Sequence, residues 1–359
     1  MMFEVSNCSY FLAANSGEGF VSLFTELYDP RDGWKLYIIK GGPGTGKSGL
    51  MRKICKKAEE LGYSHDKILC SSDPASLDAV IIYELKTAVC DGTSPHIMEP
   101  LYPGVSETIV NLGECWDEIS LKNDAQHILT LTDCNKELHK KSARYLAAAA
   151  SAAKSNDKIF SACTDFQKID NFVIRALYKF TSSDRVTKPR QIFLNGNTPD
   201  GKTVMFESAL AMCKNIVSIS DEYCCISPDV IGKLATFAQT KGLNTVIALD
   251  PLIPSSPLHL ILPDEKTGFF TSCSGYNFKA YANKNINATR FIDKDKFSVY
   301  KNKVAFNKKV SDSFLDEAIN VMQKAKTVHD ELEKYYIKAM HFEKLDSKTD
   351  KLIKKIFSC

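Results

Sequence analysis

Residues 41–48 have the residue types and spacing in this chain that best suit a chemical role. They read, in order, Gly41, Gly42, Pro43, Gly44, Thr45, Gly46, Lys47 and Ser48, which satisfies the Walker A pattern G-x-x-x-x-G-K-[ST]. In such a loop the glycines let backbone N–H groups turn inward around a β-phosphate. We expect Lys47 to reach the β- and γ-phosphates and Ser48 to place a hydroxyl on Mg²⁺. The pattern therefore predicts a binding site for a nucleoside triphosphate with Mg²⁺.

The segments on either side of this loop supply the strand and the helix that it requires. Residues 35–40, KLYIIK, are a short apolar run typical of a buried parallel strand, and residues 49–62 follow with helical spacing. A helix that starts at the loop also points its positive dipole end at the phosphates. The chain lacks the [NT]-K-x-D motif that reads guanine, so ATP is favoured over GTP.

A magnesium ion at this loop needs an acidic partner, and two candidates stand at the ends of apolar runs. Asp91 closes the run 87–91, and Asp73 follows the run 68–72. Each has an ordinary structural explanation as well, because aspartate is common in turns before glycine and in loops before proline. We predict that Asp91 serves catalysis and Mg²⁺, with Asp73 as the alternative.

His96 and Glu99 follow Asp91 closely. A histidine at this place could sense a γ-phosphate or orient a water molecule, with Glu99 just beyond it. An ordinary turn histidine and a solvated glutamate would leave the same pattern, and we favour these two interpretations.

The chain carries an internal repeat. Residues 10–27 match residues 192–210 at an offset of about 182, and helical stretches at about 133–180 and 312–357 continue the correspondence. The repeat predicts an α/β fold of two tandem duplicated P-loop NTPase-like domains. In each, a mainly parallel sheet is flanked by helices and carries a helical hairpin extension.

The repeat also identifies a misleading motif in the second half. Residues 196–203, GNTPDGKT, fit the Walker A pattern with Lys202 as the lysine, but they align with residues 15–20, outside the first loop. The counterpart of residues 40–48 is 220–228, SDEYCCISP, which has neither glycine nor lysine. We therefore expect one live and one degenerate nucleotide site, although a working loop at 196–203 stays an alternative.

The same comparison favours Asp91 over Asp73. Asp91 corresponds to a position near Thr271, so its acid is missing from the half that has lost the loop. Asp73 is matched instead with Asp250, an acid that survives in the degenerate half.

Length and composition agree with two globular domains. The chain has 359 residues, 44% of them apolar and 25% charged, and domains usually hold about 100–200 residues. We place the first domain at 1–185, with a helical hairpin at about 124–180, and the second at 186–359. Residues 1–185 hold 21 Lys and Arg against 24 Asp and Glu, whereas the second half holds 25 against 19.

The cysteines and the start of the chain predict an intracellular location. None of the twelve cysteines forms a C-x-x-C pair, and the histidines show no zinc-ligand spacing. No apolar run approaches the roughly 20 residues that cross a bilayer, and the first residues lack the pattern of a signal peptide. We expect a cytoplasmic protein with reduced cysteines and no membrane contact.

Residues 279–309 form a basic segment with nine Lys and Arg against two acids, interleaved with aromatic residues. Such a mixture suits a groove for single-stranded nucleic acid. Strands with a buried aromatic face and a solvated lysine face would look the same, and we favour that explanation.

Four segments resemble a family of uncharacterised bacterial tandem P-loop ATP-binding proteins, identified as predicted ATPases. These are GGPGTGKS at 41–48, SSDPASLDAVIIYEL at 71–85, DGTSPHIMEPLYPG at 91–104 and VNLGECWDE at 110–118. The resemblance implies a P-loop fold and ATP binding, and it extends over nearly the whole chain. Family members usually carry a loop in the second half too, and this chain departs from them at residues 220–228.

These observations predict a Mg²⁺-dependent ATPase whose first half holds ATP through residues 41–48, with Lys47 and Asp91 as catalytic residues and Ser48 and Asp91 at the metal. A metabolite hydroxyl in place of water would make it a small-molecule or nucleotide kinase. An ATP-gated protein that binds nucleic acid or another protein through its basic second half is a further alternative. In a last alternative, the nucleotide only stabilises the fold.

Overall fold

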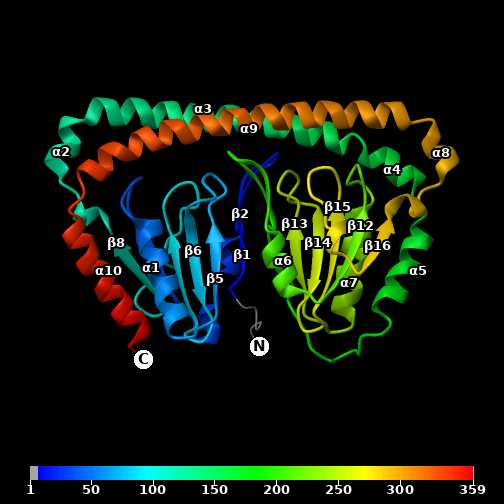
Figure 1. Cartoon of the computed structure of the whole chain (residues 1–359), viewed down its shortest axis with the longest axis horizontal. Helices are drawn as coiled ribbons and strands as arrows, with labels where there is room; N and C mark the ends of the chain where they lie inside the picture. The colour runs from blue at the N-terminus through cyan, green and yellow to red at the C-terminus, as the bar shows by residue number, and fades with distance from the viewer. Residues whose placement is uncertain (1–6, 359) are drawn as a thin grey trace.

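Two mixed six-stranded sheets lie side by side beneath two long helices in a computed structural model that describes residues 7–358 (Figure 1). The strand order in the first sheet is β1-β5-β6-β7-β4-β8, and β6 alone runs opposite to the other five strands. Its strands are β1 (Ser9–Tyr10), β4 (Lys35–Lys40), β5 (His65–Leu69), β6 (Leu77–Ile82), β7 (Thr87–Asp91) and β8 (Glu107–Asn111).

The second sheet repeats the first strand by strand, in the order β9-β13-β14-β15-β12-β16, and here β14 is the reversed strand. The strand register shifts at the corresponding place in both sheets, between Ile68 and Leu69 and between Ala248 and Leu249. Its strands are β9 (Arg190–Ile192), β12 (Asn215–Ser220), β13 (Val246–Leu249), β14 (Pro257–Leu262), β15 (Thr267–Ser272) and β16 (Lys284–Asn287).

Helices cover the sheets because the central strands are apolar on both faces and must be buried on both. Each sheet has a helix directly after the strand next to one edge, α1 (Lys47–Glu60) after β4 and α7 (Ser227–Thr240) after β12. The α/β architecture of mostly parallel strands flanked by helices is thereby confirmed. Smaller elements are the hairpins β2 (Ala13–Ser16) with β3 (Gly19–Ser22) and β10 (Asn195–Thr198) with β11 (Gly201–Val204), and helix α6 (Phe206–Met212).

The two long helices, α3 (Ala125–Lys154) and α9 (Lys301–Lys338), run antiparallel across both sheets (Figure 1). They are joined by hydrogen bonds from the Ser142 hydroxyl to the Ala318 carbonyl and from the Ser311 hydroxyl to the Ala149 carbonyl. Short helices α2 (Glu118–Asn123), α4 (Asp157–Cys163) and α8 (Lys294–Ser298) lie at their ends.

The helical ends of the two halves are exchanged. Helix α5 (Phe166–Leu177) buries its apolar face with residues of α7 and the second sheet, and α10 (Phe342–Phe357) buries Leu345, Leu352 and Ile356 with residues of α1 and the first sheet. The hairpins predicted at 124–180 and in the C-terminal stretch are therefore wrong. An amphipathic stripe shows that a helix has a buried face but not which surface covers it.

Residues 181–189, which contain the predicted domain boundary, have no regular secondary structure and connect α5 to β9. The packing units differ from the sequence halves, because each unit takes its last helix from the other half. Residues 1–6, which belong to the segment expected to lack a signal peptide, and Cys359 lie outside the described residues. Within residues 7–358 none of the helices has the length and apolar character needed to span a bilayer.

Candidate nucleotide site

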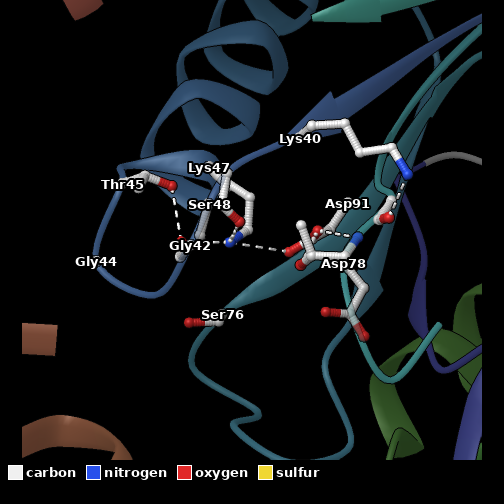
Figure 2. Close-up of polar contacts among 12 residues, drawn as sticks. Lys40, Gly42, Gly44, Thr45, Lys47, Ser48, Ser76, Asp78 and Asp91 are labelled. Atoms are coloured by element: carbon white, nitrogen blue, oxygen red, sulfur yellow. Dashed lines mark hydrogen bonds and ion pairs between the residues drawn. The ribbon is translucent and has the colours of Figure 1, made fainter. Parts of the chain in front are cut away.

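The Walker A residues form a tight loop between β4 and α1. The strand ends at Lys40 and the helix begins at Lys47. Gly44 and Gly46 have φ angles of +66° and +81°, which favour glycine over residues with a β-carbon. The Thr45 hydroxyl donates to the Gly42 carbonyl at 2.9 Å and closes the turn (Figure 2). The strand–loop–helix setting expected from the sequence is therefore present.

Lys47 lies across this loop and points toward Asp91 (Figure 2). Its Nζ donates to the carbonyl oxygens of Gly41 at 3.1 Å and Gly42 at 2.7 Å, and it lies 3.5 Å from Asp91 Oδ2. Asp91 ends β7, the parallel neighbour of β4, where it pairs in register with Ile39. The fold thus brings together the two residues predicted to be catalytic, although Lys47 and Asp91 are 44 positions apart along the chain.

Asp73 lies elsewhere. It belongs to the loop between β5 and β6, where one carboxylate oxygen accepts from the Ser76 hydroxyl at 2.7 Å and the other lies 3.5 Å from Lys326 on α9. Asp73 thereby has a structural role that keeps its carboxylate occupied.

The match of Asp73 with Asp250 is wrong. Cys70 donates its N–H to the carbonyl of Ser76, and Asp250 donates its N–H to the carbonyl of Ser256 in the same way. Cys70 is therefore the counterpart of Asp250. Asp91 pairs with Ile39 as Thr271 pairs with Ile219, so the correspondence of Asp91 and Thr271 agrees with the structure.

Asp78 is a second buried carboxylate near the loop, and the sequence reasoning missed it. It is the second residue of β6 and only 4% exposed, next to Ala79, which pairs with Cys90. Asp78 and Asp91 therefore lie beside each other at neighbouring strand ends (Figure 2). The signal was available, because LDAVII places one charged residue inside an otherwise apolar strand, where charges require partners.

His96 is that partner. Its Nε2 lies 3.5 Å from Asp78 Oδ1, and its ring stacks on Phe24 with 4.8 Å between centroids. Burial disfavours the imidazolium, but the hydrogen bond and charge of Asp78 and the charge of Asp91 outweigh this and raise the pKa of His96. His96 therefore lies in the turn that follows β7, as favoured from the sequence, but it is buried there and paired with Asp78. Glu99 is exposed and paired with Lys40 at 2.6 Å, as favoured from the sequence.

Helix α9 covers the loop from outside, which the sequence did not indicate. Glu333 Oε1 accepts from the Gly44 N–H at 3.0 Å, and a β-carbon on Gly44 would lie 2.9 Å from the Glu333 carbonyl oxygen. Tyr336 of α9 and Trp116 contact the loop at Gly42. The hydrogen bond with His329 lowers the pKa of Glu333, so a carboxylate faces a backbone donor of the loop.

The corresponding place in the second half is occupied by a carboxylate. Asp221 Oδ2 accepts from the N–H groups of Ile226 and Ser227, both at 2.8 Å, at the start of α7. Ser227 begins α7 as Lys47 begins α1. Because these helix N-terminal donors are taken by Asp221, this end of α7 offers little to a phosphate.

Residues 196–203 are a β-hairpin and not a phosphate loop. They belong to β10 and β11, with Gly201 in the turn at φ +106°. Lys202 pairs with Asp312 at 3.5 Å on α9. This second Walker A match therefore lacks the loop-to-helix geometry, as the repeat indicated.

The donor set fits Mg²⁺ only together with a nucleotide. Residues 7–358 contain no group of three or more His, Cys, Asp or Glu side chains placed to hold a metal ion. Mg²⁺ commonly binds one or two protein oxygens together with phosphate oxygens and water. Ser48, whose hydroxyl accepts the Leu77 N–H at 3.0 Å, and Asp91 are the residues that would hold it.

The aromatic residues of the basic segment 279–309 are divided between core and surface. Phe291 is buried, and Phe297 packs on Phe160 with 5.1 Å between centroids, whereas Tyr300 and Phe306 are exposed. Only part of the aromatic series is therefore available to stack on a base.

Comparisons of the whole chain with protein-family models, with curated proteins and with solved structures find no match.

Proposed function

We propose that the protein binds MgATP at residues 41–48 and hydrolyses it, as a Mg²⁺-dependent P-loop ATPase with one working site. The observation that carries this proposal is that Lys47 Nζ lies 3.5 Å from Asp91 Oδ2 beside a glycine-rich loop. Helix α1 begins directly after this loop. A cation and a carboxylate in this position suit phosphate charge and a hydrated Mg²⁺.

Different residues of the site would bind the phosphates, hold Mg²⁺ and orient the water. Backbone N–H groups of the loop and the N-terminus of α1 would hold the β-phosphate, and Lys47 would exchange its two carbonyl partners for phosphate oxygens. Ser48 and Asp91 would hold Mg²⁺, which neutralises charge on the transferring phosphoryl group. His96, kept in place by Asp78 and Phe24, is our candidate for orienting the attacking water.

Binding of the nucleotide must displace Glu333. Its carboxylate uses the Gly44 N–H, a donor that a phosphate oxygen would take. Two anions cannot share this donor, so phosphate binding would push this part of α9 away. The contact favours a second candidate function, an ATP-gated binding protein, because α9 runs from the loop to the second sheet.

Isothermal titration calorimetry with MgATP tests the proposal. Lys47→Ala should weaken binding by on the order of a hundredfold, because it removes charge-assisted hydrogen bonds worth about 1.5–3 kcal/mol each. Lys202→Ala is the matched control and should bind like the wild type. If Lys47→Ala binds MgATP as tightly as the wild type, or if only Lys202→Ala loses MgATP binding, the assignment of the site to residues 41–48 is wrong.

Phosphate release separates the possible acceptors. Release of inorganic phosphate from MgATP without any added acceptor would support hydrolysis. Binding without release would instead favour a kinase that lacks its acceptor, or a nucleotide that serves as a switch or stabilises the fold.

A further inference from the structure

A cavity of about 130 Å³ lies in the second half, where β12 and β15 end beneath α3 and α9. Its lining includes the thiols of Cys224 and Cys273, the hydroxyl of Tyr276 and the side chains of Lys202 and Lys308. It occupies the region that corresponds to the phosphate loop of the first half, since Cys224 follows β12 as Gly44 follows β4. The proposed ATPase uses none of these groups.

The sheet brings the two cysteines together. β12 and β15 are parallel neighbours with Ser220 opposite Ser272, so the segments that follow both strands leave the sheet at the same place. Cys224 has a left-handed φ of +52°, an uncommon conformation for a side chain of this kind that often marks a functional site. Its Sγ lies 3.4 Å from the Tyr276 hydroxyl, its thiol donates to the Asp221 carbonyl at 3.6 Å, and Cys273 lines the same cavity.

The pKa values of the two thiols are shifted in opposite directions by their surroundings. The interaction between the two thiols lowers the pKa of Cys273 and raises that of Cys224. Lys308, paired with Asp312 at 2.6 Å, contributes positive charge near both sulfurs. Cys273 is therefore the more nucleophilic of the two sulfurs, and Cys224 is the thiol that can follow it.

Other cysteines of the described chain lack this setting. Burial raises the pKa of Cys8 to about 12, of Cys55 to about 11 and of Cys213 to about 12. Cys225 is next to Cys224 in the chain, yet its thiol donates to the Tyr223 carbonyl at 3.1 Å and burial raises its pKa as well. The difference between Cys224 and Cys225 provides a matched control.

We propose that Cys273 and Cys224 form a thiol–disulfide exchange site that reduces small-molecule disulfides, with Cys273 as the attacking sulfur and Cys224 as the resolving one. The Cys273 thiolate attacks one sulfur of a disulfide RS–SR, forming a mixed disulfide and releasing RS⁻. The Cys224 thiol then gives up its proton and attacks the Cys273 sulfur, releasing the second RS⁻. The two cysteines are oxidised to a disulfide and RS–SR is reduced to two thiols.

The charge of the cavity favours one substrate class. Its lining reaches the solvent, since the side chains of Lys202 and Asp312 are 33% and 41% exposed. Lys202 and Lys308 favour a disulfide that carries carboxylates. Oxidised glutathione is a probe of this kind.

The test is to incubate the reduced full-length protein with oxidised glutathione and to map its disulfides by mass spectrometry. The wild type and Cys225→Ser should lose two hydrogen atoms and yield a linked pair of peptides containing Cys224 and Cys273. Cys224→Ser should stop as a glutathione adduct on Cys273, and Cys273→Ser should give neither product. A linked pair that persists in Cys224→Ser, or modification confined to the exposed Cys134, would overturn the proposal.

Competitive alkylation of the wild type avoids any effect of substitution on folding. With limiting iodoacetamide, Cys273 should react on the order of ten times faster than Cys225, because far more of it is thiolate near neutral pH. Equal rates at the two positions would contradict the proposed roles. Neither measurement involves nucleotide, so the outcome is independent of the proposed ATPase.

Discussion

Asp91 is fixed in a position that suits a magnesium partner. Thr93 donates to Asp91 Oδ1 through its N–H at 2.9 Å and its hydroxyl at 2.6 Å, which leaves Oδ2 facing Lys47. Asp73, by contrast, is held by Ser76 and Lys326. Their contacts thus distinguish Asp91 from Asp73, the two carboxylates that the sequence left as alternatives.

Asp91→Asn should therefore weaken the apparent affinity for Mg²⁺ in ATP hydrolysis by about 10- to 100-fold, the usual cost of losing a group that orients a bound metal. Asp73→Asn is the control of equal size and should leave the Mg²⁺ dependence unchanged. Titration of phosphate release with MgCl₂ measures both. A larger loss in Asp73→Asn would restore Asp73 as the metal partner.

His96 makes stability depend on pH in a defined direction. Its pKa is raised above 6.5 in the folded protein, so between the unfolded and folded values the native state binds more protons than the unfolded state. The free energy of unfolding then falls as pH rises through the folded pKa, and the full contribution is present only below the unfolded value.

Urea unfolding should be measured at pH values between the unfolded and folded pKa of His96. The free energy of unfolding should fall with rising pH in the wild type and change less in His96→Gln, which cannot titrate. A profile unchanged by the substitution would show that His96 does not take up a proton on folding. The matched control is His127→Gln, in a histidine that stacks on Tyr335 outside the site.

At the scale of elements, the strands and helices next to the loop were predictable because their signals are local. A short apolar run, the four glycines of the loop and a helical spacing specify β4, the loop and α1 with few alternatives. The partner of each C-terminal helix was not predictable, since the apolar faces of α5 and α10 would fit either sheet. The same limit hid the contact of Glu333 with Gly44, which joins residues 289 positions apart.

Glu333→Gln should tighten MgATP binding, because it removes an anion that competes with phosphate. A hydrogen bond to a charged group is worth about 1.5–3 kcal/mol and one between neutral groups about 1 kcal/mol. The difference of about 1 kcal/mol corresponds to roughly fivefold in affinity. Calorimetry should find no change in Glu331→Gln, whose carboxylate pairs with Lys334 at the surface. Weaker binding by Glu333→Gln would mean that Glu333 supports the loop.

On the scale of the whole molecule, the two halves contact each other reciprocally, as a symmetric dimer does. Phe11 and Phe193 exchange N–H to carbonyl hydrogen bonds, both at 2.9 Å, and are 182 residues apart like the matched segments of the repeat. Asn15 and Asn197 exchange side-chain to carbonyl bonds at 3.4 and 3.2 Å with the same separation. The two halves therefore form a pseudo-symmetric pair within one chain, joined by the exchanged helices α5 and α10.

The exchange of α5 and α10 predicts that the fragments 1–185 and 186–359 depend on each other to fold. Alone, the first fragment lacks α10 and exposes the surface that Leu345, Leu352 and Ile356 cover, and its own α5 lacks the surface of α7. Neither fragment should unfold cooperatively by itself, because burial of large apolar side chains contributes about 1.5–3 kcal/mol each and domains are only marginally stable.

Mixed in equal amounts, the two fragments should associate into a complex that elutes like the intact chain and regains cooperative thermal unfolding by circular dichroism. Nucleotide binding should return with it, because α10, which packs with α1 directly after the loop, arrives on the second fragment. A first fragment that folds and binds MgATP alone with the affinity of the intact chain would show that the loop needs neither α9 nor α10. The exchanged helices would then be needed to assemble the fold but not to bind nucleotide.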